Sequence, residues 1–155
     1  MDEFEFPDGV DPLELDRQVC FGLAVASRSV INLYRPVLEP LGLTHPQYLV
    51  MLALWGEAPL RFGELAHALH LDPATLSPLV KRLEALGLIE RLAIDGDDRT
   101  FALRPTEAGA ALRARALDVP RTIVQRLGLP IARLEALRDE LGALVAATRR
   151  AGVIQ

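Results

Sequence analysis

Apolar residues recur at helical spacing along most of the chain, so the sequence predicts a mainly α-helical protein. The first long helix is expected to run from Asp11-Pro12, a favourable N-cap and first helical position, to about Leu38. Its apolar positions form two adjoining rows: Val19, Leu23, Ala26, Val30 and Leu33 in one, and Cys20, Ala24, Ser27, Ile31 and Tyr34 in the other. So wide a stripe predicts packing against the chain's own body and against a second subunit.

The segment from Arg61 to Arg104 predicts a helix, a turn, a second helix and a two-stranded hairpin. The second helix has well-marked ends, because Asp72 is a good N-cap, Pro73 fits the first position and Gly87 supplies a left-handed stop. One face is apolar and is expected to be buried: Leu76, Leu79, Val80, Leu83 and Leu86. The other face is polar and basic and is expected to point outward: Thr75, Ser77, Pro78, Lys81 and Arg82.

A β-hairpin is predicted after this helix. Two β-prone runs, 88–94 and 100–103, flank an Asp-Gly pair that favours hairpin turns. Arg99 would lie at the tip, within reach of a minor groove, and Asp97 is close enough to orient its guanidinium. A capped helix or a hairpin alone is more often purely structural. Their order and spacing together predict a winged helix-turn-helix whose second helix enters the major groove of double-stranded DNA.

Further helices flank this module. Thr44 is expected to cap a helix from Pro46 to Glu57. After the hairpin, a helix beginning at Pro105-Thr106 is expected to continue past Pro120 with a kink, and a last helix opens at Leu129-Pro130. We therefore expect a single domain over residues 1–155. It consists of a winged module at 44–104, with a small β-hairpin wing, and of dimerisation helices at 11–40 and 106–152.

The charge of the chain is the main objection to DNA binding. The formal net charge is −4, and residues 61–104 hold six Lys or Arg against seven Asp or Glu. This objection is met if the basic side chains lie together on one face of the module while Glu64 and Glu84 point away from that face. The cations concerned are Lys81, Arg82, Arg91, Arg99 and Arg104. A two-fold dimer would double that patch, although non-specific binding should remain weak.

Composition excludes several other classes of protein. Half of the residues are hydrophobic, yet the longest apolar runs are too short to span a membrane. The N-terminus is acidic where a signal peptide would be basic, so a cytoplasmic protein is expected. The single cysteine excludes a disulfide within the chain, and His67 and His70 have no ligand cluster around them, so no metal site is expected. We also expect no cofactor and no catalytic residues.

Four segments carry a family resemblance: LTHPQYLVMLALW, LDPATLSPLVKRLEALGLIER, DGDDRTFAL and PTEAG. In this order they resemble the MarR family of bacterial regulators. The segment QVCFGLAVASRSVINLYRPVLEPLGLTHPQYLVMLALW resembles the organic-hydroperoxide-sensing OhrR subgroup of that family. The resemblance implies a homodimeric repressor that leaves its operator when an N-terminal cysteine is oxidised. Cys20 matches that sensor, and Tyr34 matches a tyrosine that hydrogen-bonds it.

The chain departs from the subgroup at two pocket positions, because His45 and Ala24 stand where tyrosines are frequent. His45 could still donate a hydrogen bond or, as an imidazolium, lower the pKa of the thiol. Without a second cysteine, oxidation of Cys20 would give a sulfenic acid and then a mixed disulfide with a small thiol, or over-oxidised forms.

Helix geometry constrains the proposed sensor. Cys20 and Tyr34 are fourteen residues apart, which corresponds to roughly 21 Å along one helix. They can meet only if the tyrosine comes from a second subunit. Two alternatives remain: a repressor of the same fold that binds a small aromatic or phenolic ligand, with the cysteine incidental, and a thiol peroxidase. The peroxidase is poorly supported because turnover needs a resolving partner.

Overall fold

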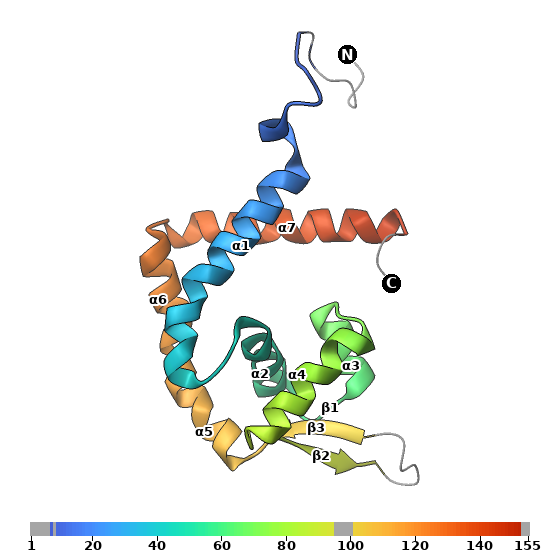
Figure 1. Ribbon diagram of the computed structural model, residues 1–155, viewed down its shortest axis with the longest axis vertical. Coiled ribbons are helices and arrows are strands. Elements are labelled where there is room, and N and C mark those ends of the chain that lie inside the picture. Colours follow the sequence, from blue (N-terminus) through green and yellow to red (C-terminus); the bar gives the residue numbers. More distant parts are fainter. Residues whose placement is uncertain (1–6, 8, 95–100, 153–155) are drawn as a thin grey trace.

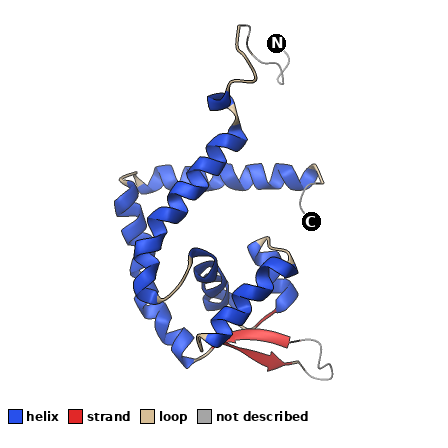
Figure 2. Cartoon of the chain, in the orientation of Figure 1, coloured by secondary structure: helices blue, strands red, loops and turns tan. Residues whose placement is uncertain are grey.

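The computed structural model describes residues 7, 9–94 and 101–152, which form a mainly helical chain with a small antiparallel sheet (Figures 1 and 2). The helices and strands are α1 (Val19–Leu38), α2 (His45–Glu57), β1 (Leu60–Arg61), α3 (Phe62–Leu69), α4 (Pro73–Ala85), β2 (Ile89–Ala93), β3 (Phe101–Pro105), α5 (Glu107–Ala116), α6 (Asp118–Leu127) and α7 (Ile131–Arg150). Short 3-10 helices cover Leu15–Arg17 and Glu39–Leu41. This is the winged helix-turn-helix architecture that the sequence predicts.

The sheet has three strands, in the order β1-β3-β2, where the sequence predicted a two-stranded hairpin. In β1, Leu60 pairs with Leu103 and Arg61 pairs with Ala102 of the central strand β3. A strand of two residues is too short to show an alternating pattern, so the prediction missed it. Its pairing ties the start of α3 to the base of the wing.

The core lies where α2, α3 and α4 meet the sheet. Its fully buried side chains are Leu38, Val50, Met51, Leu54, Leu65, Leu76, Val80, Leu83 and Leu103. The face of α4 that the spacing assigned to the core is therefore buried for three of its five residues. Leu79 packs partly against the core, and Leu86, in the C-cap position beyond the last turn, is exposed.

The start of α5 fits closely against the turn between α4 and β2. A Cβ on Gly109 would lie 1.9 Å from the backbone oxygen of Leu88, so only glycine fits there. The indole N–H of Trp55 donates to the carbonyl oxygen of Gly109 at 2.9 Å. The hydroxyl of Thr106 donates to the carbonyl oxygen of Gly87 at 2.6 Å. These contacts fix the winged module to the helices that follow it.

The first helix begins later than predicted. Asp11 does accept a hydrogen bond from the backbone of Leu13 at 2.9 Å, but this closes only a local turn. The backbone of Gln18 is extended, with φ −79° and ψ 115°, and it separates the 3-10 turn from α1. Gln18 instead donates its side-chain amide to the carbonyl oxygens of Pro12 and Glu14.

The helix after the wing is broken, whereas the sequence predicted a continuous helix kinked at Pro120. α5 ends at Ala116 and α6 begins at Asp118, so the break falls at Leu117. Pro120 is the third residue of α6, where the missing N–H would have no helical acceptor. The proline therefore marks the first turn of a new helix.

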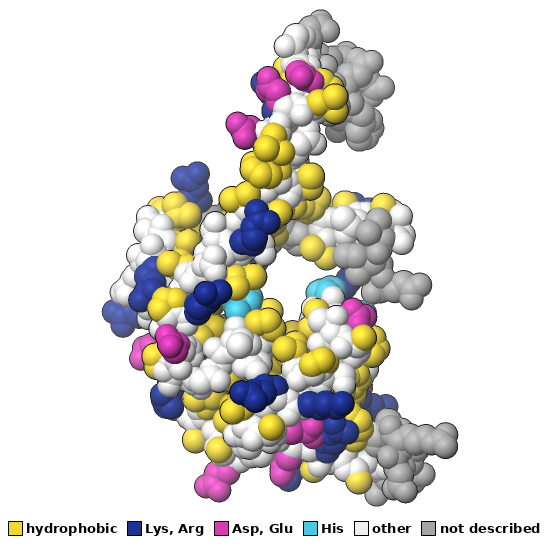
Figure 3. All heavy atoms as spheres, in the orientation of Figure 1, with side chains coloured by type: hydrophobic (Ala, Val, Ile, Leu, Met, Phe, Trp, Pro, Cys, Tyr) yellow, Lys and Arg dark blue, Asp and Glu magenta, His cyan; other side chains and the backbone are white. Residues whose placement is uncertain are grey.

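Two helices leave apolar surface uncovered in the single chain. α1 exposes Val19, Leu23, Val25 and Ile31, and α7 exposes Ile131, Leu137, Leu141, Leu144 and Val145. No residue of α7 is buried, and the space-filling view shows an opening between α7 and the winged module (Figure 3). At its far end, Arg149 reaches the α3–α4 turn and donates to Nδ1 of His70 at 2.5 Å. In the described part of the chain, none of the helices combines the length and apolarity of a membrane span.

Candidate nucleic-acid interface and cysteine site

The beginning of α4 is fixed by Asp72. Its carboxylate accepts the backbone N–H of Thr75 at 2.9 Å and the Thr75 hydroxyl at 2.8 Å. These hydrogen bonds, the backbone bond first, lower the pKa of Asp72 below its ordinary value. The N-cap predicted from the sequence is thus confirmed, and the hydroxyl of Thr75 is held at the cap.

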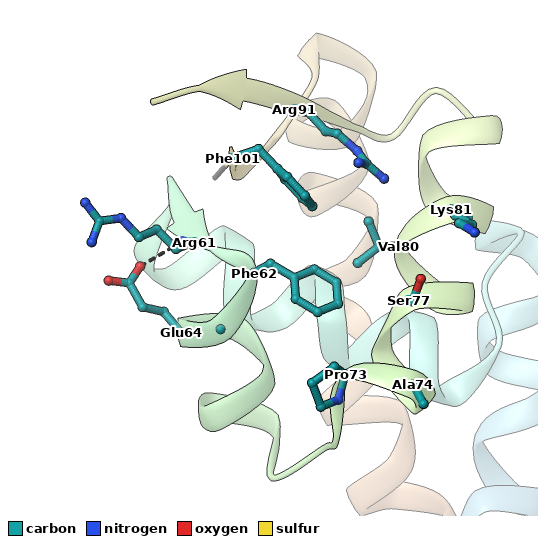
Figure 4. Close-up of a pocket in the computed structure, with 11 residues that line it drawn as sticks. Arg61, Phe62, Glu64, Pro73, Ala74, Ser77, Val80, Lys81, Arg91 and Phe101 are labelled. Atoms are coloured by element: carbon teal, nitrogen blue, oxygen red, sulfur yellow. Dashed lines mark hydrogen bonds between the residues drawn. The ribbon is translucent and has the colours of Figure 1, made fainter. Parts of the chain in front are cut away.

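The polar face of α4 divides between two sides. Ser77 and Lys81 border a groove of about 820 Å³ between α4, α3 and the wing (Figure 4). Arg82 borders a different crevice, next to α1 and the start of α2. Pro78 lies within α4 and has no N–H to donate to the carbonyl oxygen of Ala74, one turn earlier. Thr75, Pro78, Lys81 and Arg82 are all exposed, and Ser77 is half-buried.

Aromatic rings line the floor of the groove. Phe62, the first residue of α3, lies against Phe101, the first residue of β3, with 5.9 Å between ring centroids. Val80 of α4 also lines the groove, and its charged lining residues are Arg61, Lys81 and Arg91 against the single carboxylate of Glu64 (Figure 4). An apolar groove with cations at its edge, beside an exposed helix, suits the sugar-phosphate backbone of a nucleic acid.

The expected separation of basic and acidic residues is wrong for Glu84. Its carboxylate does not point away but accepts two hydrogen bonds from Arg91, at 2.6 and 3.1 Å. These bonds raise the pKa of Arg91 above its ordinary value. Arg104, also expected on the basic face, is paired with Glu90 at 2.6 Å. Asp97 and Arg99 lie outside the described residues, so their predicted place at the wing tip stays a prediction.

Cys20 lies in the first turn of α1 and is exposed. Val19 beside it is 67% exposed, and Leu23, one turn on, is 37% exposed. The thiol therefore belongs to the uncovered apolar surface of α1. A thiol buried in the core, the more frequent place for a cysteine on an apolar helix face, is excluded for the single chain.

Tyr34 and His45 are brought together from the end of α1 and the start of α2. The imidazole stands edge-on to the phenol ring, with 5.0 Å between centroids and 68° between planes. Tyr48, one turn further along α2, lies 6.1 Å from Tyr34. Burial raises the pKa of both phenols, with the charge of Tyr34 adding to the shift of Tyr48, and burial lowers the pKa of His45.

Two of the three predicted sensing residues are thus neighbours, and Cys20 lies fourteen residues from Tyr34 on the same helix. Tyr48 was missed, because a tyrosine within an apolar helix is indistinguishable from an ordinary core residue. Its spacing of three from His45 on a helix is the feature that could have pointed to it.

A second crevice of about 560 Å³ lies beside this cluster, between α1, the start of α2 and the end of α4. It is lined by Ile31, Arg35, Glu39, Leu43, Thr44, His45, Arg82 and Leu86, among others. It combines apolar walls, two guanidinium groups, the carboxylate of Glu39 and the N-terminal end of α2. Among the residues described, no three His, Cys, Asp or Glu side chains gather in a way that could hold a metal ion.

Comparison with known proteins identifies the relatives of this chain. The model of the MarR family matches residues 43–101. The organic hydroperoxide resistance transcriptional regulator of Bacillus subtilis strain 168 is 40% identical over 114 residues, which are 74% of this chain and 78% of that protein.

Solved structures of DNA-bound proteins share the fold. Reduced AbfR bound to DNA is 30% identical, with a TM-score of 0.71 over 86% of this chain and 94% of that one. The transcriptional repressor CouR bound to a 23-mer DNA duplex is 25% identical, with a TM-score of 0.78 over 88% and 98%. CouR from Rhodococcus jostii RHA1 bound to p-coumaroyl-CoA is 26% identical, with a TM-score of 0.72 over 85% and 94%.

Proposed function

Because this chain belongs to the MarR family of transcriptional regulators, we propose that it is a homodimeric repressor which leaves its operator when an organic hydroperoxide oxidises Cys20. Its membership of the family makes it a DNA-binding regulator and not an enzyme. The observation that carries the redox part is the exposure of Cys20 on an uncovered apolar helix face, at a distance from the Tyr34–His45 cluster.

The dimer is supported by the surface of α1 and α7. Both helices expose large aliphatic side chains, and Leu137 near the middle of α7 is 53% exposed. Apolar surface that is continuous along a helix marks a protein–protein interface in a protein of this size. A second copy of the chain, related by a two-fold axis, would cover these faces with the same faces of its own.

In such a dimer, α4 of each subunit enters the major groove and the wing approaches the neighbouring minor groove. Arg82 and Lys81, with Thr75, Ser77 and Pro78, form the proposed reading face, and Arg99 and Asp97 are assigned to the wing tip. The exposure of Thr75, Pro78, Lys81 and Arg82 on α4 supports the assignment. The resemblance in fold to DNA-bound AbfR and CouR supports it as well.

The proposed sensor is formed between subunits. Cys20 is too far from Tyr34 of its own helix to touch it, at roughly 21 Å for fourteen residues. An antiparallel pairing of the two α1 helices would bring Cys20 to the partner subunit's Tyr34 and His45. A phenol O–H and an imidazole N–H can each donate to a thiolate, which stabilises the reactive form in apolar surroundings.

The chemistry needs only the oxidant and a small thiol. The Cys20 thiolate attacks the outer oxygen of the hydroperoxide; an S–O bond forms, the O–O bond breaks, and the alcohol leaves after taking a proton. The sulfenic acid then reacts with the small thiol, giving a mixed disulfide and water. An apolar entrance to the thiol favours organic hydroperoxides over the more hydrated hydrogen peroxide.

Oxidation would release DNA by altering the dimer contact. A mixed disulfide adds bulk and a sulfenic acid adds a polar group where apolar faces of α1 are expected to meet. The subunits would repack and move the two α4 helices off the spacing of successive major grooves. A loss of a few kcal/mol in operator binding is enough to empty a site that is nearly full.

The experiment follows both events in one sample. Reduced protein on its operator is titrated with cumene hydroperoxide, and the mass of the Cys20 peptide and the bound DNA are measured at each step. Oxidation of Cys20 and release of DNA should rise together. Release without a mass change would disprove the redox mechanism.

The second crevice favours one alternative, a repressor that releases DNA on binding a small aromatic or phenolic ligand. Arg35 and Arg82 could pair with a carboxylate while Ile31 and Leu86 contact the ring. The structure of CouR bound to p-coumaroyl-CoA supports the binding of such a ligand, because that molecule carries a phenol ring. Release of DNA by a phenolic acid in Cys20→Ser, without oxidant, would favour this alternative.

A further inference from the structure

One side chain ties the wing to the recognition helix. Arg91 of β2 donates from Nε to Oε1 of Glu84 at 2.6 Å and from Nη2 to Oε2 at 3.1 Å. Two parallel bonds between a guanidinium and a carboxylate fix the angle between the groups as well as their distance. Glu84 belongs to the last turn of α4, so this pair crosses from the helix to the sheet.

The guanidinium also covers an aromatic ring. Its central carbon lies 4.2 Å from the centroid of Phe101, the first residue of β3. Phe101 in turn contacts Phe62 at the start of α3, and both rings lie beside Arg91 in the groove (Figure 4). Arg91 therefore joins its own strand β2 to α4 and β3 directly, and it is linked to α3 through the ring of Phe101.

We propose that Arg91 is a positioning residue, which sets the angle of the wing against α4 so that both reach the DNA together. The proposal rests on the DNA binding of the family and does not depend on the cysteine mechanism. It changes the role expected for Arg91, which the sequence suggests as a direct DNA contact. Its charge is compensated by Glu84, two of its five N–H groups are bound there and one planar face is covered by Phe101, so it is a weaker ligand for a phosphate than an unpaired arginine would be.

A direct role predicts the opposite effect of removing Glu84. If Glu84 merely masks a phosphate-binding arginine, Glu84→Gln frees the cation, removes a negative charge beside the DNA and strengthens binding. If Arg91 positions the wing, the same substitution loosens the wing and weakens binding. The sign of one measured change therefore separates the two roles.

The chain offers a matched control in the pair Arg104–Glu90. In both pairs Nε of the arginine lies 2.6 Å from Oε1 of the glutamate. The side chains of Arg104 and Glu90 are 50% and 44% exposed, and those of Arg91 and Glu84 are 44% and 26% exposed. It joins β3 to β2 within the sheet, where the two residues already face each other across the ladder. Glu90→Gln removes the same charge without detaching the wing from α4.

The test uses the full-length protein and a DNA duplex that the wild type selects from a random library. Affinity is measured by fluorescence anisotropy for Glu84→Gln, Glu90→Gln, Arg91→Lys and Glu84→Gln/Arg91→Lys, and thermal unfolding is measured in parallel. We expect Glu84→Gln and Arg91→Lys each to weaken binding about tenfold, since each loses the paired geometry. The double variant should be no weaker than either single variant, and Glu90→Gln should bind at least as tightly as wild type.

Footprinting separates positioning from a general loss of structure. In Glu84→Gln, protection of the minor groove beside each half-site from hydroxyl radicals should be lost. Protection of guanine N7 in the major groove should remain, and the unfolding midpoint should stay within a few degrees of wild type. Unchanged or tighter binding by Glu84→Gln, or an equal loss of both protections, would overturn the proposal.

Discussion

Tyr34 and His45 meet edge to face, with their ring centroids 5.0 Å apart, at the point where α1 passes the start of α2. Burial lowers the pKa of His45 below its ordinary value of 6.5, so the imidazole in the single chain is neutral at neutral pH. In the proposed sensor the imidazole N–H can donate to the partner's thiolate.

This shift gives a pH dependence of stability with a definite sign. Between the lowered pKa of the folded chain and 6.5, the unfolded chain binds more protons at His45, so stability is full above pH 6.5 and falls as the pH drops. We expect the free energy of unfolding of reduced wild type to fall more than that of His45→Gln between about pH 7.5 and 5.5. Urea titrations at both pH values measure it. Equal losses in the two proteins would show that His45 does not carry the effect.

Lys81 is expected to contact a phosphate, because it is exposed on α4 at the rim of the groove. Lys81→Ala should weaken operator binding and reduce the slope of log K against log salt by about one for each subunit. Arg121→Ala on α6 is the control, since it removes one positive charge from an exposed position outside α4 and outside the exposed apolar rows of α1 and α7. A slope that changes equally in both variants would argue against α4 as the DNA contact.

Gly109 is expected to tolerate no side chain. A Cβ there would lie 1.9 Å from the oxygen of Leu88, which is backbone and cannot swing aside. Gly109→Ala should lower the free energy of unfolding by about 1–3 kcal/mol, or more if α5 moves. Gly56→Ala in α2, where a Cβ meets no atom within 4 Å of the chain, should be neutral or slightly stabilising. Thermal or urea unfolding of both variants tests the prediction, and similar stabilities would contradict it.

The exposed row on α7 is expected to be part of the dimer interface. Leu137→Glu would place a carboxylate in the middle of that row, and the dimer should dissociate at micromolar concentration in sedimentation velocity. Ala143→Glu is the control. Each residue of a helix turns by about 100°, so position 143 lies on the opposite side of α7, roughly 160° around the helix from the middle of the row. The protein with this substitution should remain a dimer. If wild type itself sediments as a monomer, the inter-subunit sensor cannot form.

The sequence predicted the winged module well because its elements are defined locally. Asp72 and Gly87 mark the two ends of α4 through cap chemistry, and β2 and β3 correspond to two β-prone runs of the sequence. The strand β1 and the break at Leu117 have no comparable local pattern. They arise from pairing and packing with distant segments, which spacing along the chain does not encode.

The contacts within the candidate site were likewise not encoded in the spacing of residues along the chain. The family resemblance assigned Tyr34 and His45 to the pocket around Cys20 but did not predict their contact with each other, and the structure brings these two residues together from two helices. The pairing of Arg91 with Glu84 was missed, because the six residues between them span a helix end and a turn. Charge counting could not separate a free arginine from one already bound to a carboxylate.

The proposed mechanism depends most directly on Cys20, so the decisive measurement is operator binding by Cys20→Ser. The protein is held on its operator at a concentration that nearly fills the site, and cumene hydroperoxide and a small thiol are added while fluorescence anisotropy is recorded. We expect the variant to bind like the reduced wild type and to remain bound, while wild type is released. Release of Cys20→Ser to the same extent as wild type would contradict the proposal that Cys20 is the sensor.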